Sequence, residues 1–80
     1  MEELAKVREF GAKKYQRNDW MKGFKYTRSI DAALRHLMAI NSGENIDEES
    51  QCYHAACVIA NMEHLLHDML YRPQNDDRDV

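Results

Sequence analysis

Apolar residues recur at helical spacing in three segments of the chain. In the first segment they are Leu4, Val7, Gly11 and Tyr15. This spacing predicts a helix over residues 2–15, in which Gly11 would let a neighbouring backbone approach closely. Residues 16–28 lose the periodicity and predict a loop, and loops of this length in compact domains are often functional.

A second helix is expected to begin at Ser29, whose hydroxyl can cap its first turn, and to end before Gly43. Its apolar face is expected to consist of Ile30, Ala33, Leu34, Leu37 and Met38. This arrangement would leave Arg35 and His36 at the border of that face, pointing toward the turn that follows.

The third and longest helix is expected to begin near Asp47 or Glu48 and to run to Tyr71, because Pro73 cannot continue a helix. One stripe along it is apolar and consists of Ala55, Ile59, Met62, Leu66 and Met69. A second stripe is polar, is spaced 3, 4, 3 and 4, and consists of His54, Cys57, Asn61, His64 and Asp68. The polar residues 73–80 predict a disordered tail.

These elements predict an all-α fold: one small three-helix domain over residues 1–72, with one long C-terminal helix. A chain this short buries only about 60% of the surface that its unfolded form exposes. Cys52 and Cys57 lie five residues apart on one predicted helix and cannot form a disulfide that would stabilise the domain. We therefore expect homo-oligomerisation to complete the helical bundle.

The cysteine usage and the absence of long apolar runs indicate where the protein works. Unpaired cysteines are typical of a reduced compartment, and no run approaches the 18 or so apolar residues of a membrane span. We expect a cytoplasmic protein with no membrane association, in the host cell if the protein is viral.

Charge is divided unevenly along the chain. Residues 1–35 carry nine Lys and Arg against five acids, whereas residues 36–80 carry two against nine. A basic half facing an acidic half fits an anionic, metal-bound ligand such as a nucleotide, or two halves that attract each other across a dimer. A nucleic-acid partner is not expected, because the net charge is -3 and no recognisable binding motif is present.

The acidic turn after the second helix is the best candidate for a cation site. Its acids are Glu44, Asp47, Glu48 and Glu49. Mg²⁺ takes oxygen ligands and is usually held by one or two carboxylates plus substrate phosphates. The alternative is a capped, solvated turn. A zinc site of His36, His54 and Cys57 is disfavoured because it lacks a clear fourth ligand.

Cations and aromatic rings alternate in the first loop and beside it. Trp20 and Tyr15 are flanked by Lys13, Lys14, Lys22, Lys25 and Arg28. Such a set suits a stacked base with clamped phosphates. In the alternative, Trp20 anchors the loop on the core and the lysines are solvated.

Five blocks occur in a fixed order: GAKKY, NDWMKG, DAALRHL, GENIDEES and a following histidine. In this order the chain resembles the dATP/dGTP diphosphohydrolase N-terminal domain family, a small helical domain of phages and prophages. The resemblance covers roughly Phe10–Leu66 and implies a purine (deoxy)nucleotide as ligand. Two positions depart from the family pattern, since Gln51 replaces a glycine and Cys57 stands where a second histidine is usual.

From the residues and the resemblance together, we expect a phage-type purine (deoxy)nucleotide-binding protein. As an enzyme it would hydrolyse dATP or dGTP to the monophosphate and pyrophosphate with Mg²⁺. The expected ligand-binding residues are Lys14, Tyr15, Asn18, Trp20, Lys22 and Arg35. The expected metal ligands are Glu44, Asp47 and Glu49, and the expected catalytic residues are His36, His54 and Glu49.

A non-catalytic function is the main alternative. In longer members of the family this domain precedes a MazG-type domain with its own acidic metal motif, which this sequence does not contain. Together with Gln51 and Cys57, this favours an oligomeric sponge that sequesters a nucleotide, or a cyclic nucleotide immune signal as an anti-defence protein. An accessory subunit of a separate enzyme is a third possibility.

Overall fold

A computed structural model describes residues 2–14 and 22–79 of the chain. Its helices are α1 (Glu2–Lys14), α3 (Tyr26–Asn41), α4 (His54–Tyr71) and the short 3-10 helix η1 (Pro73–Asn75). Within this part of the chain the β pairing is limited to an isolated bridge between Ile46 and Tyr53. The prediction of an all-α fold with three main helices and a long last one is confirmed.

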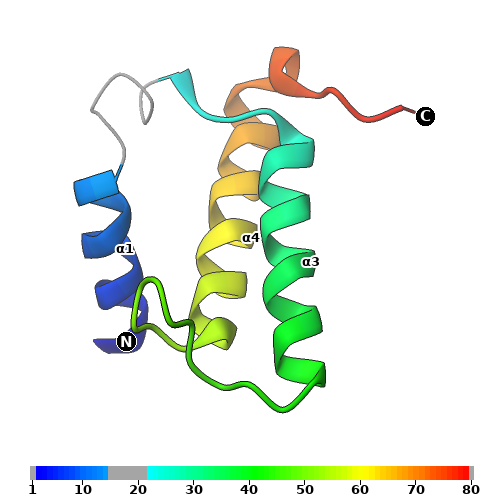
Figure 1. The fold of residues 1–80 in the computed structure, drawn as a ribbon. Coiled ribbons are helices and arrows are strands. Elements are labelled where there is room, and N and C mark those ends of the chain that lie inside the picture. Colours follow the sequence, from blue (N-terminus) through cyan, green and yellow to red (C-terminus); the bar gives the residue numbers. More distant parts are fainter. Residues whose placement is uncertain (1, 15–21, 80) are drawn as a thin grey trace.

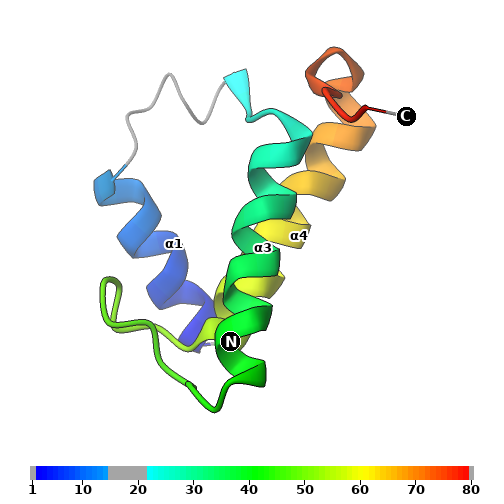
Figure 2. The ribbon, with the colours of Figure 1, turned by 45° about the vertical axis from the view of Figure 1, so that its right-hand side comes forward.

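Helices α3 and α4 run antiparallel and side by side, and α1 packs against α4 (Figure 1). The loop between α3 and α4 passes beside α1 before it enters α4, as the turned view shows (Figure 2). Leu4 on α1 and Leu65 on α4 are buried, and Arg8 of α1 reaches Glu63 of α4. The three helices and this loop therefore surround a common interior.

The inner faces of α3 and α4 combine polar side chains with apolar ones, whereas their outer faces carry large exposed apolar residues. On α4 the predicted polar stripe turns inward: His54, Cys57 and Asp68 are buried, and Asn61 and His64 are half-buried. The outer apolar stripes are exposed and comprise Leu34, Leu37 and Met38 on α3 with Ile59, Met62, Leu66 and Met69 on α4.

The face assigned to the core of α3 was therefore wrong. Met38 is 73% exposed, whereas His36 is 7% exposed and Ser29 is 3% exposed. Ala33 alone of that predicted set is buried. Small and polar side chains occupy the interior because the space there is a pocket and not a close-packed core.

Two helix starts also differ from the prediction. Helix α3 begins at Tyr26, one turn before Ser29, and its first turn is capped from far along the chain. Asp77 accepts hydrogen bonds from the Thr27 backbone N–H at 2.9 Å and from Thr27 Oγ1 at 2.6 Å. Helix α4 begins at His54 because the segment before it folds on itself, with Asp47 N–H donating to the Cys52 carbonyl at 2.8 Å.

The segment expected to be a disordered tail follows the end of α4 at Tyr71. The structure gives it the helix η1 and the Asp77 cap, and Asn75 Nδ2 donates to the Lys22 carbonyl at 3.1 Å. These contacts bring the end of the chain to the start of α3. No helix among the described residues has the length and apolar character needed to span a membrane.

Asp68 joins these elements from the inside. Its side chain is fully buried and accepts hydrogen bonds from the Phe24 backbone N–H at 3.3 Å and from Arg72 Nη1 at 3.1 Å. Its carbonyl accepts a hydrogen bond from the Tyr26 hydroxyl at 3.3 Å. Because a buried carboxylate is tolerated only when it is paired and hydrogen-bonded, these contacts fix the start of α3 against the end of α4.

Candidate functional site

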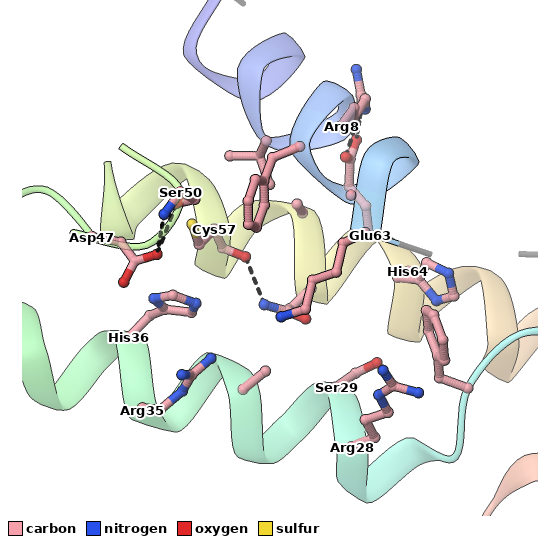
Figure 3. A pocket seen from close by; sticks show the side chains of 18 of the residues that line it. Arg8, Arg28, Ser29, Arg35, His36, Asp47, Ser50, Cys57, Glu63 and His64 are labelled. Atoms are coloured by element: carbon pink, nitrogen blue, oxygen red, sulfur yellow. Dashed lines mark hydrogen bonds and ion pairs between the residues drawn. The ribbon is translucent and has the colours of Figure 1, made fainter. Parts of the chain in front are cut away.

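A pocket of about 430 Å³ lies between α1, α3, α4 and the loop that joins α3 to α4 (Figure 3). This volume lies within the range of small-molecule sites, about 300–1,000 Å³. Its wall includes five apolar or small residues: Val7, Phe10, Gly11, Ala32 and Ala60. Polar side chains line it as well, so the pocket offers both apolar contact and directed hydrogen bonds.

One end of the pocket is formed by His36, Asp47 and Ser50. Asp47 Oδ2 accepts hydrogen bonds from the Ser50 N–H at 3.1 Å and from Ser50 Oγ at 2.8 Å. Burial acts to raise the pKa of Asp47, but these hydrogen bonds and the nearby charge of His36 outweigh it and hold the pKa below its ordinary value. Burial, and then the nearby charge of Arg35, lower the pKa of His36. His36 is therefore neutral at pH 7.

Behind His36 lies a second histidine that does not reach the pocket. The Nδ1 atoms of His36 and His54 are 2.7 Å apart, and His54 Nε2 is 3.1 Å from Glu44 Oε1. His54 is 3% exposed, whereas the Glu44 side chain is half exposed. The three residues form a line from the solvent through the protein to the pocket.

The opposite end is formed by Arg28, Phe24 and His64 (Figure 3). The Arg28 guanidinium lies 4.2 Å from the centre of the Phe24 ring, and the His64 ring centre lies 4.7 Å from it. His64 Nδ1 is 3.2 Å from Asp68 Oδ2. Asp68 thus positions both the ring of Phe24, through its backbone, and the imidazole of His64.

Among the described residues, four cations line the pocket: Arg8, Lys14, Arg28 and Arg35. Arg8 pairs with Glu63 at 2.7 Å, and Lys14 with Glu49 at 3.4 Å, both at the surface. Arg35 pairs with no carboxylate in the part of the chain that the structure describes. Its charge is therefore available to an anion in the pocket.

The predicted site residues fall into four groups. Those that line this pocket are Lys14, Arg35, His36, Asp47 and Glu49. Glu44 and His54 lie behind it, and Lys22 lines a smaller pocket of about 310 Å³ beside Phe24 and Arg28. Tyr15, Asn18 and Trp20 lie outside the described residues.

The predicted metal ligands each have a protein partner. Glu44 contacts His54, Asp47 binds Ser50, and Glu49 pairs with Lys14. Among residues 2–14 and 22–79, no three His, Cys, Asp or Glu side chains gather closely enough to hold a metal ion. These residues therefore do not fit a self-standing Mg²⁺ site, and the Mg²⁺ assignment stays a prediction.

Several pocket residues were not among the predicted site residues, namely Arg8, Phe24, Arg28, Asn61, Glu63 and His64. Asn61 and His64 belong to the polar stripe of α4, and that stripe was the signal that could have found them. Cys57 also lines the pocket, and burial raises the pKa of its thiol. Gln51 has a φ of 59°, a conformation that glycine adopts without strain, which accounts for the glycine in the family pattern.

Comparison with known proteins identifies the family of this chain. The sequence profile described as "dATP/dGTP diphosphohydrolase, N-terminal" matches residues 1–78. A dATP/dGTP diphosphohydrolase of Salmonella phage PMBT28 is 34% identical over 77 residues, which are 96% of this chain and 26% of that protein. The chain thus spans about a quarter of the length of this relative. No solved structure gives a significant match. The chain belongs to the dATP/dGTP diphosphohydrolase N-terminal family.

Proposed function

We propose that this chain binds a purine deoxynucleotide in the pocket between α1, α3 and α4. The observation that carries the proposal is the position of Arg35, a cation without a carboxylate partner among the described residues, on the wall of a pocket large enough for a nucleotide. The purine preference comes from the family name and from the phage relative, which is described as acting on dATP and dGTP.

The phosphates would bind to the guanidinium groups of α3. Arg35 and Arg28 lie two turns apart on this helix and both line the pocket. A guanidinium group donates two parallel hydrogen bonds to a phosphate, which gives direction as well as charge. Lys14 would add charge if the phosphate displaced its surface partner Glu49, a weak exposed pair.

The nucleoside would lie against the apolar residues of the pocket wall. Val7, Phe10 and Ala60 provide apolar surface there, and Asn61 provides polar contact. Asn61 Nδ2 donates to the Cys57 carbonyl at 2.9 Å, which orients its amide oxygen as an acceptor. An orienting amide on an apolar wall is a common way to recognise a base.

Hydrolysis to the monophosphate and pyrophosphate is the finer form of the proposal. It would use Glu49, which lines the pocket and pairs with Lys14, one of the cations proposed to bind the phosphates. We derive no step through a metal ion, because the acidic side chains of the turn are engaged with protein partners.

A second candidate is binding without turnover, as in a sponge for a nucleotide or a cyclic nucleotide. The observation that favours it is the same engagement of Glu44, Asp47 and Glu49, which gives these acids structural roles. Both candidates use the pocket and differ in whether product forms.

The test is isothermal titration of the chain with dATP, dGTP, dCTP and a cyclic dinucleotide, with and without Mg²⁺, followed by chromatography of the mixtures. Arg35→Ala should weaken binding of the preferred ligand by about 1.5–3 kcal/mol, the range for a hydrogen bond to a charged group. Lys13→Ala is the matched control, since Lys13 is an exposed cation that does not line the pocket.

Each outcome decides between the candidates. Monophosphate and pyrophosphate among the products would establish hydrolysis, and retention of unchanged ligand would establish sequestration. Equal affinity of the wild type, Arg35→Ala and Lys13→Ala would place the nucleotide elsewhere. No binding of any nucleotide would overturn the proposal.

A further inference from the structure

Two buried histidines share one short contact, and the hydrogen-bond network around them fixes where their protons lie. His36 Nδ1 and His54 Nδ1 are 2.7 Å apart, which requires one nitrogen to donate and the other to accept. His54 Nε2 is 3.1 Å from Glu44 Oε1, and a carboxylate only accepts. His54 must therefore carry its proton on Nε2.

The position of the proton on His54 determines the position of the proton on His36. A neutral His54 with a proton on Nε2 has a lone pair on Nδ1, which must accept from His36. His36 then carries its proton on Nδ1 and has a lone pair on Nε2. With both rings neutral, the reverse arrangement would set a lone pair of His54 against the Glu44 carboxylate, which is repulsive.

The Nε2 atom of His36 reaches the pocket. It has no hydrogen-bond partner among residues 2–14 and 22–79, since the contact with His54 uses Nδ1. No buried side-chain nitrogen or oxygen among the described residues lacks a partner, so an unpartnered Nε2 is accessible from outside. His36 is 7% exposed and lines the pocket, and the pocket is therefore where Nε2 is accessible.

We infer that Glu44 and His54 are positioning residues that hold His36 as the Nδ1–H tautomer, so that His36 Nε2 accepts a hydrogen bond from an N–H or O–H group of the ligand's nucleoside. This inference rests on the proposed function for the identity of the ligand. An acceptor suits a base amine or a sugar hydroxyl and repels a phosphate oxygen. In this arrangement the guanidinium of Arg35 binds the phosphates, and His36 accepts a hydrogen bond from the nucleoside.

The charged groups around His36 also favour a nucleoside over a phosphate beside its ring. Arg35 precedes it on α3, Asp47 and Glu49 approach from the loop, and His54 approaches from α4. The two carboxylates oppose a second anion at this end of the pocket. The phosphates therefore belong with Arg28 and Arg35 along α3, away from Asp47.

The tautomer can be measured without any ligand. Long-range ¹H–¹⁵N correlation spectra of the full chain at about pH 8, above the ordinary histidine pKa of about 6.5, should show His36 with its proton on Nδ1. Exposed neutral histidines favour the opposite tautomer. Glu44→Ala should shift His36 toward a mixture, and Glu48→Ala, which removes a neighbouring acid that contacts neither histidine, should leave it unchanged. A proton on His36 Nε2 in the wild type would overturn the inference.

A second measurement tests the role of Nε2. His36→Asn keeps an N–H donor toward His54 and removes the acceptor from the pocket. The affinity for dATP or dGTP should fall about three- to tenfold, the value of one neutral hydrogen bond, while the affinity for inorganic pyrophosphate should not change. Unchanged affinity for the nucleotide, or an equal loss for pyrophosphate, would overturn the assigned role. If the wild type binds no nucleotide, the proposed function and the ligand part of the inference both fail, and the spectra still decide the tautomer.

Discussion

Gly23 lies directly against Asp68. A Cβ atom at Gly23 would collide with Asp68 Oδ1 and would lie 2.7 Å from Arg72 Cδ, and the φ of Gly23 is +72°. The loop before α3 can therefore approach the Asp68 carboxylate this closely only because residue 23 has no side chain. This contact sets the position of Phe24, whose N–H binds Asp68 and whose ring forms one end of the pocket.

Gly23→Ala should destabilise the protein more than Gly43→Ala, and Gly43 is the matched control. Gly43 also has a positive φ, +98°, but nothing lies within 4 Å of its added Cβ. Both variants incur the cost of the left-handed conformation, roughly 1–2 kcal/mol. Gly23→Ala should cost about 1–3 kcal/mol more, the usual range for overpacking. Urea denaturation measures the free energy of unfolding of both variants. Equal losses would mean that Asp68 and Arg72 move away from the added Cβ without destabilising the protein.

Asp68→Ala should be the most damaging single change to a carboxylate in this chain. It removes the buried carboxylate that accepts hydrogen bonds from the Phe24 N–H and from the Arg72 guanidinium. Removing one partner of a buried ion pair costs about 3–5 kcal/mol. Asp31→Ala, at an exposed position of α3, should cost far less. A similar free energy of unfolding for the two variants would contradict the anchoring role of Asp68.

The stability of the protein should fall as the pH drops below about 6.5, the ordinary pKa of histidine. Burial lowers the pKa of His36 in the folded state. Below pH 6.5 the unfolded chain therefore binds more protons at His36 than the folded chain does, and the free energy of unfolding decreases. Above that pH neither state is protonated there, and this contribution no longer changes with pH. His36→Asn should lose less stability than the wild type between about pH 7.5 and about pH 5.5. Parallel losses in denaturation experiments would assign the pH dependence to other groups.

We propose that the outer apolar stripes of α3 and α4 pack against a second copy of the chain. A monomer of 9.4 kDa is expected to expose about 5,000 Å², whereas this chain exposes 5855 Å². The excess of about 850 Å² is comparable to the area, about 800 Å², that each partner buries in a stable interface. A patch of this kind usually marks an interface.

Light scattering should therefore give a mass well above 9.4 kDa at micromolar concentrations. Leu66→Lys, at a position that is 57% exposed, should reduce the mass to that of the monomer without unfolding the chain. Glu9→Lys, a charge change at an exposed position of α1, should leave the mass unchanged. A monomeric wild type would end this proposal.

The periodicity of apolar residues predicted the helices well but predicted the orientation of α3 wrongly. The described part of α1 is helical throughout Glu2–Lys14, within the predicted range 2–15, and α4 ends at Tyr71 as predicted. The apolar face of α3 was assigned to the core by the rule that buried faces are apolar. That rule fails where the interior holds a ligand pocket and a second apolar surface faces outward.

The start of α4 was predicted too early for a local reason. Acids at Asp47 and Glu48 suit a helix N-terminus, but the side chain of Asp47 binds Ser50 and its backbone pairs with Cys52. Such side-chain bonds hold the backbone in a turn. The His36–His54 contact crosses from α3 to α4 and depends on this turn, so no spacing along the sequence predicts its 2.7 Å distance.

The inward polar stripe of α4 has a consequence for evolution in the laboratory. Replacing buried polar groups by well-packed apolar ones of similar volume is often neutral or stabilising. Here, however, His54 contacts the pocket residue His36, and Asn61 lines the pocket. A selection for heat resistance alone should therefore accumulate apolar residues at these positions and yield robust proteins with no ligand site. A selection that includes a ligand should keep both and improve the outer surface instead.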